Sequence, residues 1–226
     1  MADVDEHFER RQLLRAYRRG LISDELFAEQ MREIGADSGA NGGPGSNGRS
    51  AAYTVEPHRY RIGKRTYATE RVMLIRFLDD FRAAETFGGV VLSSWLDVAR
   101  DRELRGGLRV VCEREAMHGR LLGNRLAEIG GRPEKSLPET GREASRARFG
   151  SREVSDGEKI REIVRRLKDV ESAVAPIREV IDQIEEDRET RNLLASILED
   201  EAATVRWFHA TAERLGVPIG DRNGSA

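Results

Sequence analysis

Cysteine is nearly absent from this chain, and so are long hydrophobic runs and an excess of charge of one sign. The single cysteine, Cys112, excludes an internal disulfide framework, a cysteine-rich zinc site and an iron centre held by thiolates. The longest apolar run, 87–96, is interrupted by a Gly-Gly and a Ser-Ser pair, so neither a membrane span nor a signal peptide is expected. The 38 basic and 40 acidic side chains are mixed along the chain and predict no nucleic-acid surface. We therefore expect a soluble cytoplasmic protein with neither nucleic acid nor membrane among its partners.

Residues 101–130 have the hydrophobic spacing of one long helix, and Glu115 and His118 stand on its apolar face. The apolar residues that define this face are Leu108, Val111, Leu122, Leu126 and Ile129. Leucine or valine is the usual occupant of such positions, because burying an unpaired carboxylate costs on the order of several kcal/mol. Something must compensate the charge of Glu115, and a metal ion is the natural candidate.

Four long helices are predicted between residues 67 and 220, so we expect an all-α fold. The connection 131–155 is polar and long, which fits a crossover between two helical hairpins. Pro176 is expected to bend the third helix. The expected helices begin at Thr69, Asp101, Ser155 and Asp187.

The residues before this bundle are predicted to form a small tethered unit. Residues 1–35 have the pattern of two short amphipathic helices, the first over 4–19, and 36–66 that of a flexible Gly-rich linker followed by an irregular arm. The sequence 19–31, Arg-Gly-Leu-Ile-Ser-Asp-Glu-Leu-Phe-Ala-Glu-Gln-Met, resembles the SHOCT module, a helical hairpin attached to other domains. This resemblance implies an interaction or oligomerisation role, so a protein partner is expected for the hairpin.

The second half of the bundle repeats the first at an offset of 86 residues, the distance from Asp101 to Asp187. Asp-Arg-Glu-Leu-Arg at 101–105 matches Asp-Arg-Glu-Thr-Arg at 187–191. At the same offset Glu85 corresponds to Glu171, Glu115 to Glu201, His118 to Thr204, and Ile129-Gly130 to Leu215-Gly216. Each predicted hairpin therefore carries one Glu at the same distance before its turn and one at the same distance after it.

This spacing brings four carboxylates to one depth of the bundle core, because the two positions come level in an antiparallel hairpin. Four negative groups at one depth cannot all ionise without cations. Two divalent metal ions bridged by carboxylates would neutralise them, and oxygen ligands with an imidazole suit iron or manganese. The residues also allow a metal-free core, in which Glu115 bonds His118 while Arg82 and Lys168 pair with the neighbouring glutamates.

Over residues 69–216 the chain resembles the ferritin-like, rubrerythrin-type di-iron carboxylate proteins. In that family the first and third helices carry one Glu each, and the second and fourth carry Glu-x-x-His. The resemblance implies a ferritin-like four-helix bundle that holds two iron ions, with manganese as the other candidate. The implied metal ligands are Glu85, Glu115, His118, Glu171 and Glu201. Thr204 departs from the pattern, which has histidine there, and is expected to leave one weak metal position.

The same resemblance implies an oxidoreductase with no catalytic residue beyond the metal ligands. The single histidine favours oxidation of ferrous iron, since ferritins proper also work with one histidine. Reduction of peroxide or dioxygen is the second candidate activity. The alternative is a degenerate bundle that acts as a non-enzymatic binding or assembly module, which Thr204 and the tethered hairpin favour. The apolar stretch 86–98 of the first helix, with its Gly-Gly pair, favours a homodimer or larger homo-oligomer.

Overall fold

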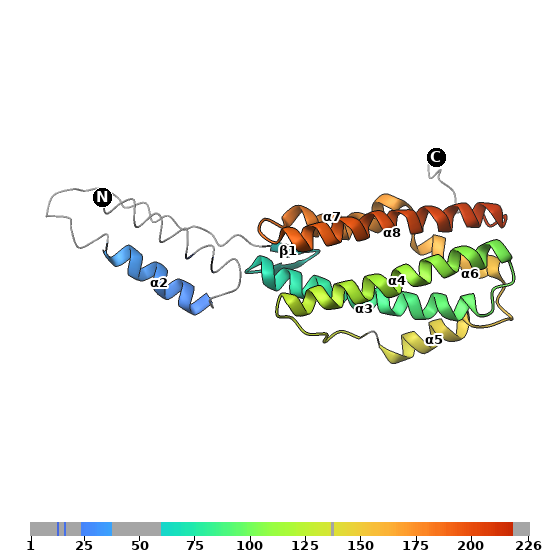
Figure 1. The fold of residues 1–226 in the computed structure, drawn as a ribbon, viewed down its shortest axis with the longest axis horizontal. Helices are drawn as coiled ribbons and strands as arrows, with labels where there is room; N and C mark the ends of the chain where they lie inside the picture. Colours follow the sequence, from blue (N-terminus) through green and yellow to red (C-terminus); the bar gives the residue numbers. More distant parts are fainter. Residues whose placement is uncertain (1–12, 14–15, 17–23, 38–59, 137, 219–226) are drawn as a thin grey trace. The chain divides into compact units, whose positions relative to one another are not determined.

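Seven helices and two short strands make up the described part of the chain in a computed structural model (Figure 1). The described residues are 13, 16, 24–37, 60–136 and 138–218. The chain divides into two compact units, Met1–Leu74 and Ile75–Ala226. The all-α prediction is confirmed, since the strands have three residues each. The elements are α2 (Asp24–Asp37), β1 (Tyr60–Ile62), β2 (Arg65–Tyr67), α3 (Glu70–Leu96), α4 (Arg102–Glu128), α5 (Glu139–Phe149), α6 (Asp156–Arg166), α7 (Val170–Gln183) and α8 (Arg188–Arg214).

The described elements that lie wholly in the first unit are α2 and a small β-hairpin. Strands β1 and β2 pair antiparallel, with Tyr60 opposite Tyr67. The turn between them contains Gly63, whose φ of 56° is a conformation that a side chain disfavours. The last residues of the predicted arm therefore form a hairpin rather than irregular chain. Of the predicted helix 4–19 only residues 13 and 16 are described, and both are helical; the Gly-rich linker lies outside the described residues.

Helices α3 and α4 form a hairpin whose starts match the sequence prediction. The hydroxyl of Thr69 accepts the N–H of Val72 at 3.2 Å, and Asp101 caps α4 by accepting the N–H of Leu104 at 2.7 Å. Helix α4 ends just before Gly130, which has a left-handed φ of 78°. The predicted apolar face of α4 is buried: its buried residues are Leu104, Leu108, Val111, His118, Leu122 and Leu126.

Helix α8 repeats the capping of α4, and the two helices run antiparallel beside one another (Figure 1). Asp187 caps α8 by accepting the N–H of Thr190, as Asp101 does for α4. Each of these aspartates also accepts from an arginine in the last turn of the other helix. Arg125 Nη2 lies 2.7 Å from Asp187 Oδ1, and Arg214 Nη2 lies 2.7 Å from Asp101 Oδ1. The 86-residue repeat is thus a reciprocal relationship in space as well as in sequence.

The third predicted helix is interrupted, which corrects the prediction that Pro176 bends a continuous helix. Pro176 lies inside α7, whereas the break falls at 167–169, between α6 and α7. Asp169 starts α7 as a helix cap by accepting the N–H of Ser172 at 2.7 Å. On the other side of the break, His209 Nε2 donates to the carbonyl of Leu167 at 2.6 Å. Both new helix ends therefore have hydrogen-bond partners, which stabilises the interruption.

The start of α6 is fixed to the turn between α3 and α4. Ser155 and Glu158 form the predicted capping box. The carboxylate of Asp156 accepts the indole N–H of Trp95 at 2.8 Å and the backbone N–H of Arg100 at 2.9 Å. These hydrogen bonds fix the start of α6 beside the turn between α3 and α4, where Trp95 is fully buried.

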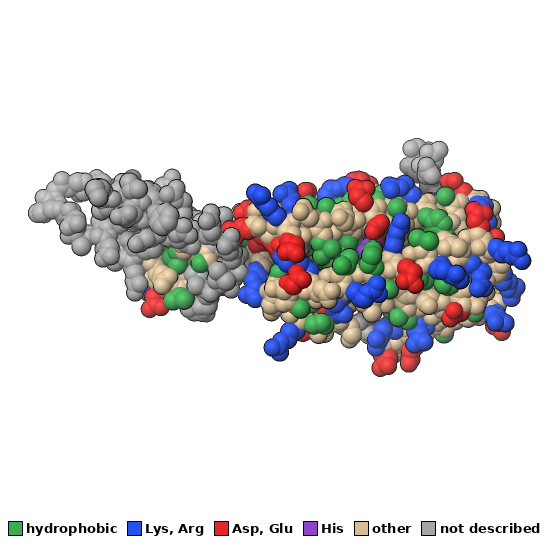
Figure 2. All heavy atoms as spheres, in the orientation of Figure 1, with side chains coloured by type: hydrophobic (Ala, Val, Ile, Leu, Met, Phe, Trp, Pro, Cys, Tyr) green, Lys and Arg blue, Asp and Glu red, His purple; other side chains and the backbone are tan. Residues whose placement is uncertain are grey.

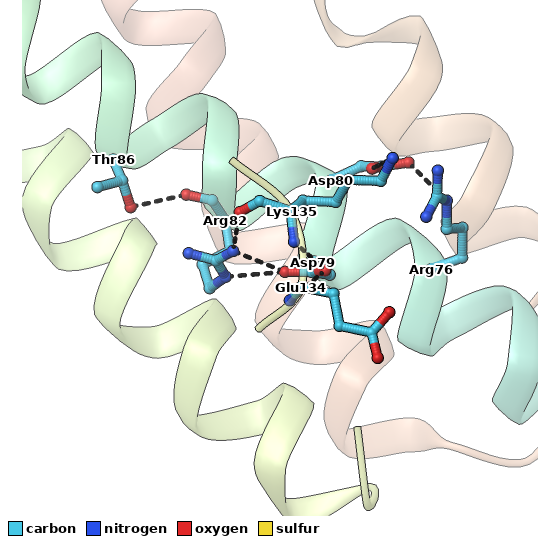
Figure 3. A network of polar contacts seen from close by, with 7 residues as sticks. All are labelled: Arg76, Asp79, Asp80, Arg82, Thr86, Glu134 and Lys135. Carbon is cyan, nitrogen blue, oxygen red and sulfur yellow. Dashed lines mark hydrogen bonds and ion pairs between the residues drawn. The ribbon is translucent and has the colours of Figure 1, made fainter. Parts of the chain in front are cut away.

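The crossover between the hairpins is anchored on α3 and contains a helix, α5, that the sequence pattern did not predict. Asp79, which is 4% exposed, accepts the backbone N–H groups of Glu134 and Lys135 at 3.0 and 2.8 Å (Figure 3). Arg82 donates to Asp79 and to the carbonyl of Lys135, both at 2.7 Å. Burial by itself would raise the pKa of Asp79, but these hydrogen bonds outweigh it and lower the pKa.

The surface of the second unit mixes basic and acidic side chains over the face shown in Figure 2. Small groups of hydrophobic side chains lie among them, and Val110, Met117 and Leu121 of α4 are exposed. Among the described residues, no helix is both long enough and apolar enough to cross a membrane.

Candidate metal centre

Three side chains from three helices meet in the second unit: Glu85 of α3, His118 of α4 and Glu201 of α8. One ligand atom of each lies within 4.8 Å of the other two. His118 Nδ1 is 3.1 Å from Glu85 Oε2 and 3.2 Å from Glu201 Oε1. The side chains of His118 and Glu85 are 1% and 6% exposed, whereas that of Glu201 is 21% exposed. Two carboxylate oxygens and one imidazole nitrogen thus surround a point at which a single metal ion would fit.

The other imidazole nitrogen of His118 is held by Asp200, the residue before Glu201. Nε2 lies 3.3 Å from Asp200 Oδ2. In metal sites a carboxylate at the far nitrogen fixes the histidine tautomer, so that the near nitrogen faces the metal. Asp200 would therefore leave Nδ1 available between Glu85 and Glu201. Asp200 is not among the residues predicted from the sequence.

Glu115 lies within electrostatic reach of the three ligands, although its oxygens are not among the atoms that meet within 4.8 Å. Burial raises the pKa of Glu115 to about 9, and the charges of Glu85 and Glu201 add to this rise while His118 opposes it. The carboxyl group is therefore protonated at neutral pH. It is a further candidate donor close to the cluster, and a cation in its place would lower this pKa by stabilising the ionised carboxylate.

The pKa values of Glu85 and His118 are raised as well, as expected where several carboxylates lie close together without a cation. Burial raises the pKa of Glu85 to about 7, and the charge of Glu201 adds to it, although the hydrogen bond from His118 opposes both. Burial alone would lower the pKa of His118, but hydrogen bonds to Glu201, Glu85 and Asp200 raise it to about 10. The imidazole is then a cation that donates from both nitrogens. The metal-free cluster thus uses protons to balance its carboxylates.

Glu171 does not join the cluster, which corrects its expected position in the core. It lies in the first turn of α7, its side chain is 69% exposed, and it forms an ion pair with Arg178. The break at 167–169 explains this placement, because it turns Glu171 into a helix-start residue, where a carboxylate is favoured by the helix dipole. The carboxylates of Glu85, Glu115 and Glu201 are thus gathered without their fourth member.

Thr204 takes the place where the repeat would have its second histidine, and it is 3% exposed. Its hydroxyl accepts from Arg114 Nη1 at 3.4 Å. His209 does not replace the missing imidazole, because its Nε2 donates to the carbonyl of Leu167. Among the described residues the cluster therefore has one imidazole, that of His118.

No protein-family profile, no curated protein and no solved structure matches this chain.

Proposed function

We propose that this protein is a ferritin-like bundle that binds one divalent transition-metal ion, iron or manganese, and oxidises ferrous iron. The observation that carries the proposal is the meeting of Glu85, His118 and Glu201 within 4.8 Å. Oxygen donors with one imidazole suit iron and manganese better than metals that prefer thiolates. The reciprocal capping of α4 and α8 supports two hairpins related as in ferritin-like proteins.

The charges of the cluster support a bound cation. Glu85, Glu115 and His118 all have raised pKa values, so the folded chain holds protons here that these groups would ordinarily have released. A divalent ion would displace those protons and compensate the carboxylates directly. Burial, which makes the carboxylates expensive to ionise alone, would strengthen their attraction to such an ion.

One ion is proposed, rather than the two expected from the sequence, because the donors gather around one point. Glu171 is exposed and paired with Arg178, and Thr204 has no imidazole to offer. The remaining donors are Glu85, His118 and Glu201. A single nitrogen of His118, Nδ1, lies within 3.2 Å of a carboxylate oxygen of each of the two glutamates, so the three donors surround one point. A second ion would find few ligands among the described residues.

In the proposed reaction Glu85, His118 and Glu201 hold the metal, Glu115 is a further donor, and Asp200 orients His118. Iron held by these residues would supply one-electron redox chemistry, with dioxygen or peroxide as the oxidant of the ferrous ion. The carboxylates favour the product, because their negative charge stabilises the more highly charged ion. Glu201, at 21% exposure, lies on the side through which iron and oxidant would enter.

The proposal is tested by metal content and by ferrous oxidation, with two histidine variants as a matched pair. Protein purified after growth with iron or manganese should retain about one ion per chain and should speed the oxidation of added ferrous iron in air. His118→Gln should lose both properties, because an amide can keep hydrogen bonds but cannot replace the imidazole ligand. His209→Gln should keep both, since its partner is the carbonyl of Leu167.

Circular dichroism of both variants checks that the helices remain. Less than about half an ion per chain, together with a melting temperature unchanged by added metal, would contradict the proposal. So would full oxidation activity in folded His118→Gln protein.

One observation favours the alternative of a metal-free binding module. His118 already has carboxylate partners at both nitrogens, so the cluster can exist as a hydrogen-bonded, protonated core. In that case the N-terminal unit, with α2, would provide the interaction surface. The metal analysis above separates the two functions, because this alternative requires a chain that binds no iron or manganese.

A further inference from the structure

The residue before each core glutamate differs in charge between the two halves of the repeat. Arg114 precedes Glu115 on α4, and Asp200 precedes Glu201 on α8, again 86 residues apart. These two equivalent residues contact one another: Arg114 Nε lies 3.5 Å from Asp200 Oδ1. Their side chains are 31% and 36% exposed, so the pair lies at the edge of the cluster.

Arg114 and Asp200 each form a hydrogen bond with a residue on the other helix, at the last position of the Glu-x-x-His motif or of its copy. Asp200 Oδ2 accepts from His118 Nε2 at 3.3 Å. Arg114 Nη1 donates to the hydroxyl of Thr204 at 3.4 Å. His118 and Thr204 are themselves equivalent in the repeat. One half of the centre therefore pairs a carboxylate with a histidine, and the other pairs a guanidinium with a threonine at the corresponding place.

The two pairs have opposite consequences for a metal ion. A carboxylate behind an imidazole orients it and strengthens it as a ligand. A guanidinium carries a permanent positive charge, has no acceptor atom, and cannot lose its proton in a protein. Placed beside Thr204, it puts a fixed cation where a second metal ion would otherwise be held by the second motif.

We propose that Arg114 and Thr204 act together to limit the centre to one metal ion, with the Arg114 guanidinium taking the place of the second cation. This inference rests on the proposed function and concerns the number of ions that the same site accepts. It makes Arg114 a specificity-determining residue, since it repels a second cation through space and binds the side chains that would surround it.

The two changes should then be effective only in combination. With Thr204→His alone, the new imidazole would face a guanidinium and have no carboxylate behind it. With Arg114→Asp alone, the cation would be gone but the nitrogen ligand would still be missing. Arg114→Asp with Thr204→His restores on this side the pairing that Asp200 and His118 show on the other.

The experiment counts Co²⁺ ions per chain by equilibrium dialysis, and visible spectra of bound Co²⁺ report its nitrogen and oxygen ligands. Wild type and Thr204→His should each bind one ion, and Arg114→Asp/Thr204→His should bind two. Arg120→Asp/Thr204→His is the matched control with the same charge change on α4, and it should bind one, because Arg120 is exposed and lines the outer groove between α3 and α4. Circular dichroism establishes that each variant is folded.

If the aspartate variant does not fold, Arg114→Gln/Thr204→His removes the charge without adding another, and it should bind a second ion more weakly. Two ions in Thr204→His alone would overturn the inference, because Arg114 would then exclude nothing. One ion in folded double variants that lack Arg114 would overturn it as well. A wild-type chain that binds no Co²⁺ is a separate failure: it would remove the proposed metal site, and this inference with it.

Discussion

The carboxylate of Glu115 on α4 packs directly against the backbone of Gly88 on α3. A Cβ placed on Gly88 would overlap Oε2 of Glu115 and would lie 3.3 Å from its Cδ. Gly88 therefore leaves the space that the carboxylate of Glu115 occupies, within electrostatic reach of Glu85 and Glu201. Gly88 is thus part of the site, although it has no side chain that could be a ligand.

Gly88→Ala should weaken metal binding while leaving the fold intact. The added methyl group would displace the end of a movable side chain rather than the backbone, so Glu115 would rotate away from the cluster. We expect the affinity for Mn²⁺ to fall by roughly tenfold, as when the support of a ligand is lost. Isothermal titration measures this change, and thermal unfolding measures the stability of the same protein.

Gly106→Ala is the control for this variant, because a Cβ on Gly106 would meet nothing within 4 Å. It should raise the free energy of unfolding by about 0.5–1 kcal/mol through helix propensity and should leave metal affinity unchanged. Unchanged affinity in Gly88→Ala would show that Glu115 is not a donor to the metal.

The metal-free protein should become less stable as the pH rises from about 6 to 9. The pKa values of Glu85 and Glu115 rise from 4.5 to about 7 and about 9 on folding, and that of His118 from 6.5 to about 10. Groups with raised pKa values bind protons more tightly in the folded chain. Their contribution is complete below the unfolded pKa values and is lost as the pH rises through the folded ones. Melting temperatures across this range should therefore fall.

Two companion melts identify the source of this dependence. Glu115→Gln keeps the shape of the side chain without its ionisation, and it should flatten the slope of melting temperature against pH. Saturating Mn²⁺ should stabilise the protein more at the alkaline end, because fewer protons then compete for the ligands. A melting temperature that rises with pH in the metal-free protein would contradict the assignment of this cluster.

Asp79→Ala should be the most destabilising of the aspartate substitutions on α3. It removes the acceptor of two backbone N–H groups of the crossover and leaves Arg82 without its carboxylate (Figure 3). We expect a loss of about 3 kcal/mol in the free energy of unfolding, measured by urea titration. Asp80→Ala is the neighbouring control: its side chain is 46% exposed, and it pairs with Arg76 and, at the long distance of 4.0 Å, with Lys135 of the crossover. The loss of these exposed pairs should stay within about 0.5 kcal/mol. Equal effects of the two would show that the crossover is not held by Asp79.

The sequence was informative where local signals and the repeat agreed. Asp101 and Asp187 cap α4 and α8 as their shared motif predicts, because capping depends only on neighbouring residues. The repeat also predicted that Glu85, His118 and Glu201 would lie together, and the structure brings these three side chains within 4.8 Å. That they bind metal stays a prediction.

The predictions from the sequence were wrong or incomplete where contacts between helices, rather than the hydrophobic pattern of one helix, decided the structure. Asp169 before Ser172 is a local capping signal at the break that the prediction of one continuous helix passed over. The hydrogen bond from His209 to Leu167, which comes from another helix, has no local signal in the sequence. Asp200 and Arg114 were missed for a different reason. They are polar residues beside polar residues, and only their position before the two core glutamates, at the common offset of 86, could have indicated their role.

The sharpest comparison available in this chain is between Glu85 and Glu171, which are equivalent in sequence but not in space. Glu85 is 6% exposed and lies against His118, whereas Glu171 is 69% exposed and pairs with Arg178. Glu85→Gln should therefore abolish tight binding of iron or manganese, because it removes one of the three converging ligands. Glu171→Gln should leave the metal content unchanged and should cost at most about 1 kcal/mol of stability, from an exposed ion pair and a helix-dipole contact. Metal analysis of both purified variants decides the matter: equal loss from the two would mean that Glu171 does reach the centre, and that the symmetric four-carboxylate arrangement is the right one.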